Sequence, residues 1–176
     1  MLKEFLTALD TEELFGELAF KPNQIGSQIA HYDAATTDLN QYQLALIGVI
    51  DSRGNLANEG CAMGALHFRK EFYKLFIPSV DLPFKMIDMG NINAGEQIRD
   101  THFALATIML ELMRHKIVPI IIGGSHDITY GQFLSYQEFY TMINLVVVDE
   151  KIDIEEPEGG LEANSYLMPI LAHQPN

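Results

Sequence analysis

The sequence predicts an α/β fold in which a mainly parallel sheet carries helices on both faces. Short apolar runs that suit buried strands alternate with longer segments whose apolar residues recur at helical spacing. Polar residues close several of these runs, as expected where strands end at the edge of a sheet. The chain has 176 residues, which fits a single domain over residues 1–176.

The first elements follow this alternation. Residues 1–43 are expected to form an N-terminal helix and an irregular arm. Leu44–Ile50 is a continuous apolar run that ends at Asp51, and such a run is typical of a strand covered on both faces. The segment 61–76 has apolar residues at helical spacing, and this stripe is expected to pack on the sheet. The residues of the stripe are Cys61, Ala65, Phe68, Phe72 and Leu75.

The middle of the chain repeats the pattern. Residues 84–90 are a weaker strand candidate. The segment 93–116 is the clearest helix of the chain, with Asn93 and Glu96 predicted to mark its start. Its apolar stripe consists of Ile98, Leu105, Ile108, Met109 and Leu112.

The last third of the chain continues with a strand at Val118–Ile122, a helix within residues 127–140 and a strand at Leu145–Val148. After Ile154, acids, glycines and prolines precede a final apolar segment, which predicts a long loop and one more helix. Because strands that alternate with helices are connected by crossovers, these elements predict a mainly parallel sheet.

Composition and charge exclude several classes of partner. Because no apolar run approaches the ~20 residues that span a bilayer, we expect no membrane association. The net charge is -13, whereas nucleic-acid binding needs a basic face, so no nucleic acid is expected. The acidic amino terminus does not resemble a signal peptide, which favours a cytoplasmic location. Cys61, the only cysteine, is expected to be a buried small residue rather than a catalytic thiol.

Candidate site residues gather at the predicted carboxyl edge of the sheet, where open parallel sheets bind ligands. These residues are Asp51, His126, Asp127, Asp149 and Asp153. A lone histidine after a glycine turn is usually a loop or helix-cap residue. Imidazole together with several carboxylates, however, suits a divalent transition metal such as Mn or Zn. A water bound to such a metal loses its proton near neutral pH and becomes a nucleophile.

Three stretches of the chain resemble the ureohydrolase family, which comprises arginase, agmatinase and formiminoglutamase. "IGVIDSRGNLANEGCAMGALHFRK" resembles the family's first strand and the turn before its first core helix. "IIIGGSHDITYG" is similar to its GGxH segment, and "VVVDEKIDI" stands where the family has DAHxD. The resemblance implies a three-layer α/β/α arginase-like fold. It also implies hydrolysis of a small-molecule amidine or guanidino substrate at a binuclear manganese centre, in a homo-oligomer.

The resemblance assigns metal ligands residue by residue. His126 and Asp153 fall on ligands of the first manganese, and Asp149 falls on a carboxylate that bridges both. Lys151 replaces the histidine that ligates the second metal, and an ammonium has no lone pair for a metal. The family's late DxD pair has no counterpart before Asn176. The chain therefore resembles the amino-terminal half of a truncated family fold, and we expect it to be inactive alone.

Two functional hypotheses stay open. The first is a manganese-dependent hydrolase of the formiminoglutamase or arginase kind with an incomplete metal site, in which Asn164 and Ser165 weakly match the substrate loop. The second is a non-catalytic relative that serves as a ligand-binding or assembly domain, which Lys151 favours. Since residues two apart share a face of a strand, Lys151 is expected to pair with Asp149 or Asp153; the alternative is that it reaches solvent.

Overall fold

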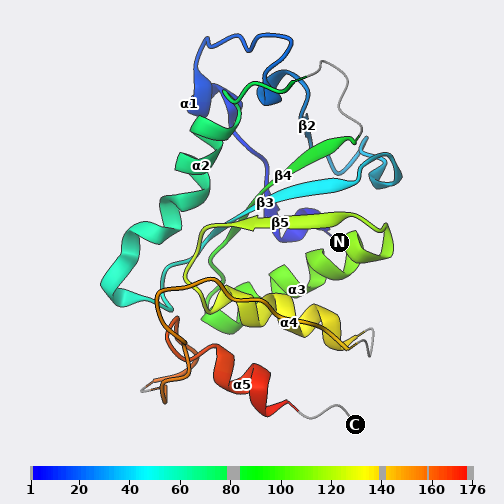
Figure 1. The fold of residues 1–176 in the computed structure, drawn as a ribbon. Coiled ribbons are helices and arrows are strands. Elements are labelled where there is room, and N and C mark those ends of the chain that lie inside the picture. Colours follow the sequence, from blue (N-terminus) through cyan, green and yellow to red (C-terminus); the bar gives the residue numbers. More distant parts are fainter. Residues whose placement is uncertain (1, 79–83, 139–141, 158, 174–176) are drawn as a thin grey trace.

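The computed structural model describes residues 2–78, 84–138, 142–157 and 159–173 of the chain. A sheet forms its middle layer, and helices lie on both faces of this sheet (Figure 1). The predicted three-layer α/β architecture is therefore confirmed. No described helix is both long and apolar enough to cross a membrane.

Five strands form the sheet within the described residues. They are β1 (Leu6–Thr7), β2 (Ala30–His31), β3 (Leu44–Ile50), β4 (Met86–Asn93) and β5 (Val118–Ile122). The central strand β3 pairs in parallel with β4 and β5, β2 pairs in parallel with β4, and β1 pairs with β4 in antiparallel fashion. The sheet is mainly parallel, as predicted. Strands β1 and β2 lie in the region that was predicted as an irregular arm. Each has only two residues, too few to show an alternating pattern, so the sequence did not predict them.

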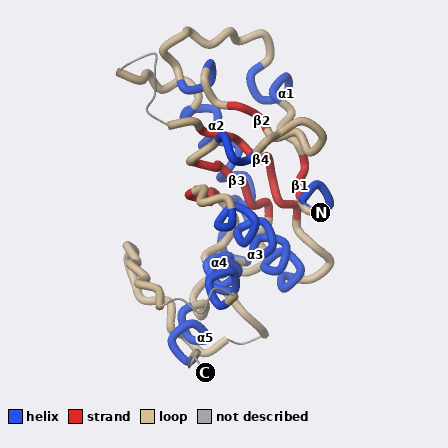
Figure 2. The backbone as a smooth tube through the Cα atoms, turned by 90° about the vertical axis from the view of Figure 1, so that its right-hand side faces the viewer, coloured by secondary structure: helices blue, strands red, loops and turns tan. Residues whose placement is uncertain are grey.

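Helices cover the two faces unequally (Figures 1 and 2). The helices are α1 (Thr11–Phe15), α2 (Gly64–Phe72), α3 (Ile98–Arg114), α4 (Ile128–Gln137) and α5 (Leu167–Ala172). Helices α1 and α2 lie on one face of the sheet, and α3 lies on the other with α4 packed beside it. Helix α5 packs on α4, away from the sheet.

The start of α3 differs from its prediction. Strand β4 continues to Asn93, and the helix begins at Ile98 rather than near Asn93. The Gln97 backbone N–H donates to the Asp100 carboxylate at 2.7 Å, which satisfies one of the free donors at the helix start. The capping acid is therefore Asp100, four residues after the predicted Glu96.

The side chains of β3 build a core on each face of the sheet. Ala45, Ile47 and Val49 pack into the core that α3 covers, while Leu46 packs with aromatic side chains on the α2 side. All four are almost completely buried. Successive strand residues point to opposite faces, so a strand between two helical layers must be apolar at every position.

The prediction of a strand at Leu145–Val148 is wrong. These residues have no regular secondary structure, and Val146 and Val148 are 84% and 96% exposed. Strand β5 is the edge of the sheet and pairs only with β3 among the described residues. Strand formation needs a partner backbone to satisfy N–H and C=O groups, and the described residues supply none beside this run.

A buried ion pair joins α2 to β4. Arg69 Nε and Nη2 donate to the Asp88 carboxylate at 2.7 and 2.8 Å, and both residues are buried. The Tyr73 hydroxyl donates to the same carboxylate at 2.8 Å. Burial and the neighbouring Asp88 charge raise the pKa of the Tyr73 phenol well above its ordinary value, so it stays a donor. These contacts fix α2 on its face of the sheet.

We expect Arg69→Ala to lower the free energy of unfolding by about 3–5 kcal/mol, because it leaves Asp88 charged and buried without a cation. Lys74→Ala is the control, since it breaks an exposed pair in which Lys74 Nζ lies 3.0 Å from Glu71 Oε1. That change should alter stability by less than about 1 kcal/mol. Urea unfolding measures both. Equal stability of Arg69→Ala and the parent would show that the pair does not hold α2.

Candidate metal centre

Three of the predicted ligands meet at the carboxyl edge of the sheet. His126 Nδ1 lies 3.2 Å from Asp149 Oδ2 and 3.1 Å from Asp153 Oδ2. One potential ligand atom from each residue lies within 4.8 Å of the others. His126 follows β5, whereas the two aspartates follow the segment after α4. The structure thus brings His126 and Asp149 together, although the predicted strand before Asp149 does not form.

Two glycines turn the chain at the end of β5. Gly123 and Gly124 have φ values of +82° and +75°, a backbone region that side chains with a Cβ rarely adopt. A Cβ on Gly123 would also lie 2.9 Å from the backbone nitrogen of Ala65. The turn places His126 just beyond β5, with its side chain 59% exposed toward the two aspartates.

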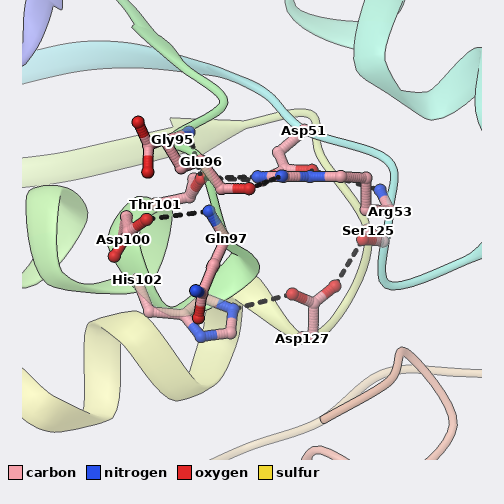
Figure 3. A network of polar contacts seen from close by, with 10 residues as sticks. All are labelled: Asp51, Arg53, Gly95, Glu96, Gln97, Asp100, Thr101, His102, Ser125 and Asp127. Atoms are coloured by element: carbon pink, nitrogen blue, oxygen red, sulfur yellow. Dashed lines mark hydrogen bonds and ion pairs between the residues drawn. The ribbon is translucent and has the colours of Figure 1, made fainter. Parts of the chain in front are cut away.

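Asp51, which follows β3, lies at this edge but is not part of the cluster. Its carboxylate accepts hydrogen bonds from Arg53 Nη2 and from the Thr101 hydroxyl, each at 2.7 Å (Figure 3). Burial opposes ionisation of Asp51, but these hydrogen bonds outweigh it and hold the pKa of the carboxyl below its ordinary value. The Asp51 carbonyl accepts from the Ser125 N–H at 3.1 Å. Asp51 therefore supports the loop that carries His126.

Asp127 also turns away from the cluster, although it follows His126 directly. Its carboxylate is buried and accepts from the Ser125 hydroxyl, and it lies 2.7 Å from His102 Nε2 (Figure 3). His102 on α3 was absent from the predicted site. The available signal was its spacing: a histidine four residues after Ile98 and three before Leu105 lies on the buried stripe of the helix.

The predicted pairing of Lys151 with Asp149 or Asp153 is wrong. The Lys151 Nζ lies 3.5 Å from Glu155 Oε1, and the Lys151 side chain is 61% exposed. The prediction assumed a strand, in which residues two apart share a face. Because no strand forms here, that constraint does not apply.

Asn164 and Ser165, the candidates for a substrate loop, make local contacts. The Ser165 hydroxyl is buried, donates to the Glu162 carbonyl at 3.2 Å and accepts from the Glu162 N–H at 3.0 Å. The Asn164 amide donates to the Glu155 carboxylate. These bonds shape the turn at residues 162–165. A role of this turn in substrate binding stays a prediction.

Two further features lie outside the cluster. Burial raises the pKa of the partly buried Cys61 thiol, which disfavours the thiolate that a nucleophile needs. An open hollow of about 540 Å³ lies between α4, α5 and residues 142–145, and none of the three candidate ligands lines it. Neither feature adds a group to the candidate metal centre.

The cluster suits one divalent transition metal ion. An imidazole nitrogen with two carboxylates is a donor set that manganese or zinc accepts. Asp153 is only 3% exposed, and its carboxylate has His126 as its one polar partner among the described side chains. Burial of a charged carboxylate costs free energy unless other groups compensate the charge, so a cation next to Asp153 would be favourable. Within the described ranges, no second group of three such side chains is close enough to hold another ion.

Comparison with known sequences decides the family. Residues 42–171 match the sequence profile of the arginase family. The chain belongs to the arginase family. The formimidoylglutamase of Hahella chejuensis is 32% identical over 137 residues, which cover 72% of this chain and 41% of that protein. The formimidoylglutamase of Geobacillus sp. is 24% identical over 183 residues, which cover 95% of this chain and 55% of that protein.

Solved structures of arginase-family proteins share the fold. Formimidoylglutamase from Bacillus subtilis superposes with a TM-score of 0.74 at 20% identity, covering 88% of this chain and 51% of that one. Trypanosoma cruzi formiminoglutamase with Mn²⁺ gives a TM-score of 0.72 at 16% identity, covering 87% and 54%. This arginase-family chain therefore spans about half the length of the relatives that it matches.

We expect Gly123→Ala to destabilise the protein more than Gly16→Ala. Both glycines have a positive φ, in regions that cost a residue with a Cβ about 1–3 kcal/mol. A Cβ at Gly16 meets nothing within 4 Å, whereas one at Gly123 meets the backbone of Ala65. The difference in Tm between the two variants, measured by thermal unfolding, reports the cost of this crowding. Equal losses in both variants would mean that the turn is not held tightly against α2.

Proposed function

We propose that this chain is the metal-binding, amino-terminal half of a manganese-dependent hydrolase of linear amidines, of the formimidoylglutamase kind. The observation that carries the proposal is the convergence of His126, Asp149 and Asp153 at one edge of the sheet. Membership of the arginase family and the names of the relatives support the reaction class. In this proposal the site is incomplete, because these three side chains suffice for one ion and the described residues offer no second such group.

The three side chains have distinct roles in this proposal. His126 would offer Nδ1 to the ion, and the two aspartates would offer carboxylate oxygens that balance its charge. Manganese, when bound, would supply an acidified water as the nucleophile. Lys151 stands where the family has a histidine that ligates the second metal, and its Nζ lies 3.5 Å from Glu155 Oε1. An amidine carries positive charge, which suits a chain with a net charge of -13.

A non-catalytic relative is the second candidate, and the outward position of Lys151 favours it. With Lys151 exposed and paired to Glu155, no described side chain replaces the missing second histidine near the cluster. The same fold would then serve as a ligand-binding or assembly domain. In either case we propose a cytoplasmic homo-oligomer that binds neither nucleic acid nor membranes. The acidic charge supports the first exclusion.

Manganese occupancy tests the proposal. After dialysis against micromolar manganese, elemental analysis should find well under one ion per chain, because the cluster offers only three protein ligands. His126→Ala should remove this binding. His115→Ala is the matched control, since His115 pairs with Glu111 on α3 and takes no part in the cluster. Lys151→His should raise the occupancy only modestly.

Two tightly held ions per chain would contradict the incomplete site, and unchanged binding by His126→Ala would contradict the assigned ligands. The same preparation should show no turnover of arginine, agmatine or formiminoglutamate above a manganese-only blank. Turnover of any of them would mean that the centre is already complete in this chain.

A further inference from the structure

A buried polar contact between α3 and the loop after β5 lies beside the candidate centre without joining it. His102 Nε2 lies 2.7 Å from Asp127 Oδ2, and the Ser125 hydroxyl donates to Asp127 Oδ1. His102 and Asp127 are 4% and 2% exposed. Figure 3 shows the imidazole and the carboxylate facing each other, with the Asp51–Arg53 pair above them in the view. Both Asp127 oxygens thus have protein partners.

Stability alone is a weak reason for this contact. His102 occupies a position on the buried stripe of α3, where an apolar residue would fill the space without loss of hydration. Replacing a buried polar pair by apolar side chains is often neutral or stabilising. What an apolar pair cannot supply is a fixed direction, because hydrogen bonds restrict geometry and hydrophobic contact does not.

The side chain whose direction matters here is that of His126, which precedes Asp127 in the sequence. Asp127 points into the protein, whereas the neighbouring His126 side chain points out toward Asp149 and Asp153. A Cβ on Gly54 would overlap the Asp127 carboxylate, so the carboxylate is closely packed as well as hydrogen-bonded.

The main chain on either side of His126 is also held. The Ser125 N–H donates to the Asp51 carbonyl at 3.1 Å, and the His126 carbonyl accepts from the Thr129 N–H at 3.0 Å. With its neighbours held by backbone bonds and by the Asp127 side chain, the Cα–Cβ bond of His126 has one orientation.

We propose that His102 and Asp127 are positioning residues that aim His126 at the two aspartates before an ion binds. They touch no candidate ligand atom and act only through the loop. The inference rests on the proposed metal-binding function. Side chains that orient a metal ligand typically change metal affinity by about 10–100-fold when they are removed. A pair that acts one residue away from the ligand should fall at the lower end of that range.

The test compares manganese affinities measured by electron paramagnetic resonance titration. His102→Phe should raise the Kd for Mn²⁺ about tenfold. His102→Gln keeps an amide donor near the position of Nε2 and should recover most of the affinity. Tyr73→Phe is the matched control, because it also removes a buried hydrogen bond to a carboxylate, here the 2.8 Å contact with Asp88. That variant should lose stability but keep the parent Kd.

A second readout needs no metal. The His126 and Tyr166 rings meet edge to face, with centroids 6.1 Å apart and an interplanar angle of 81°. Nuclear Overhauser contacts between these rings should be present in the parent and in Tyr73→Phe, and should weaken or vanish in His102→Phe. If His102→Phe does not fold, Ser125→Ala removes the other side-chain hydrogen bond to Asp127 and should shift both readouts in the same direction.

The two readouts separate the two claims. If the parent binds no manganese, the proposed function fails, and the ring contacts still decide whether His102 positions His126. If His102→Phe or Ser125→Ala keeps both the ring contacts and the parent Kd, the positioning role is refuted. An equal loss of affinity in Tyr73→Phe would refute it too, because the effect would then follow from general destabilisation.

Discussion

The turn at Gly123 and Gly124 is the constraint on which the candidate centre depends. After β5 the chain passes through two successive residues with positive φ, a backbone region that residues with a Cβ rarely adopt, and Gly123 lies close against the start of α2. The turn brings Ser125 beneath the carbonyl of Asp51 and leaves His126 at the open edge. A Cβ at Gly123 would crowd the backbone nitrogen of Ala65, and one at Gly124 would crowd the Asp51 carbonyl oxygen.

Helix α3 connects the ends of two strands through consecutive residues. Thr101 donates to Asp51, which follows β3, and His102 lies against Asp127, which follows β5. Successive helical residues project about 100° apart, so one turn of the helix reaches two neighbouring loops. The apolar stripe of α3 packs the same helix on the sheet, and its burial therefore also sets the position of these polar contacts. The same helix therefore packs the core and holds the two loops beside the candidate centre.

Local patterns predicted most of the fold, and two of the failures, the strand at Leu145–Val148 and the pairing of Lys151, share a cause. The strand Leu44–Ile50 and the body of α3 follow from apolar runs and helical spacing, because each element buries its own side chains within this chain. The run Leu145–Val148 has the same apolar character, but an apolar run indicates burial without naming the partner that buries it. Because this strand does not form, residues two apart need not share a face, and Lys151 is not constrained to lie beside Asp149 and Asp153. The convergence of the candidate ligands His126, Asp149 and Asp153 was predictable from motif resemblance, whereas the contact of His102 joins distant segments.

Two apolar parts of the described fold are uncovered. Strand β5 has no outer partner among the described residues, and Val146 and Val148 in the run Leu145–Val148 are largely exposed. The relatives are about twice as long as this chain. The most direct test is anomalous diffraction at the manganese edge from crystals soaked at a Mn²⁺ concentration far above micromolar, at which even a weakly held ion occupies its site. We predict one peak per chain, at coordination distance from His126 Nδ1 and the carboxylates of Asp149 and Asp153. Two adjacent peaks, or a single peak away from these residues, would contradict the account.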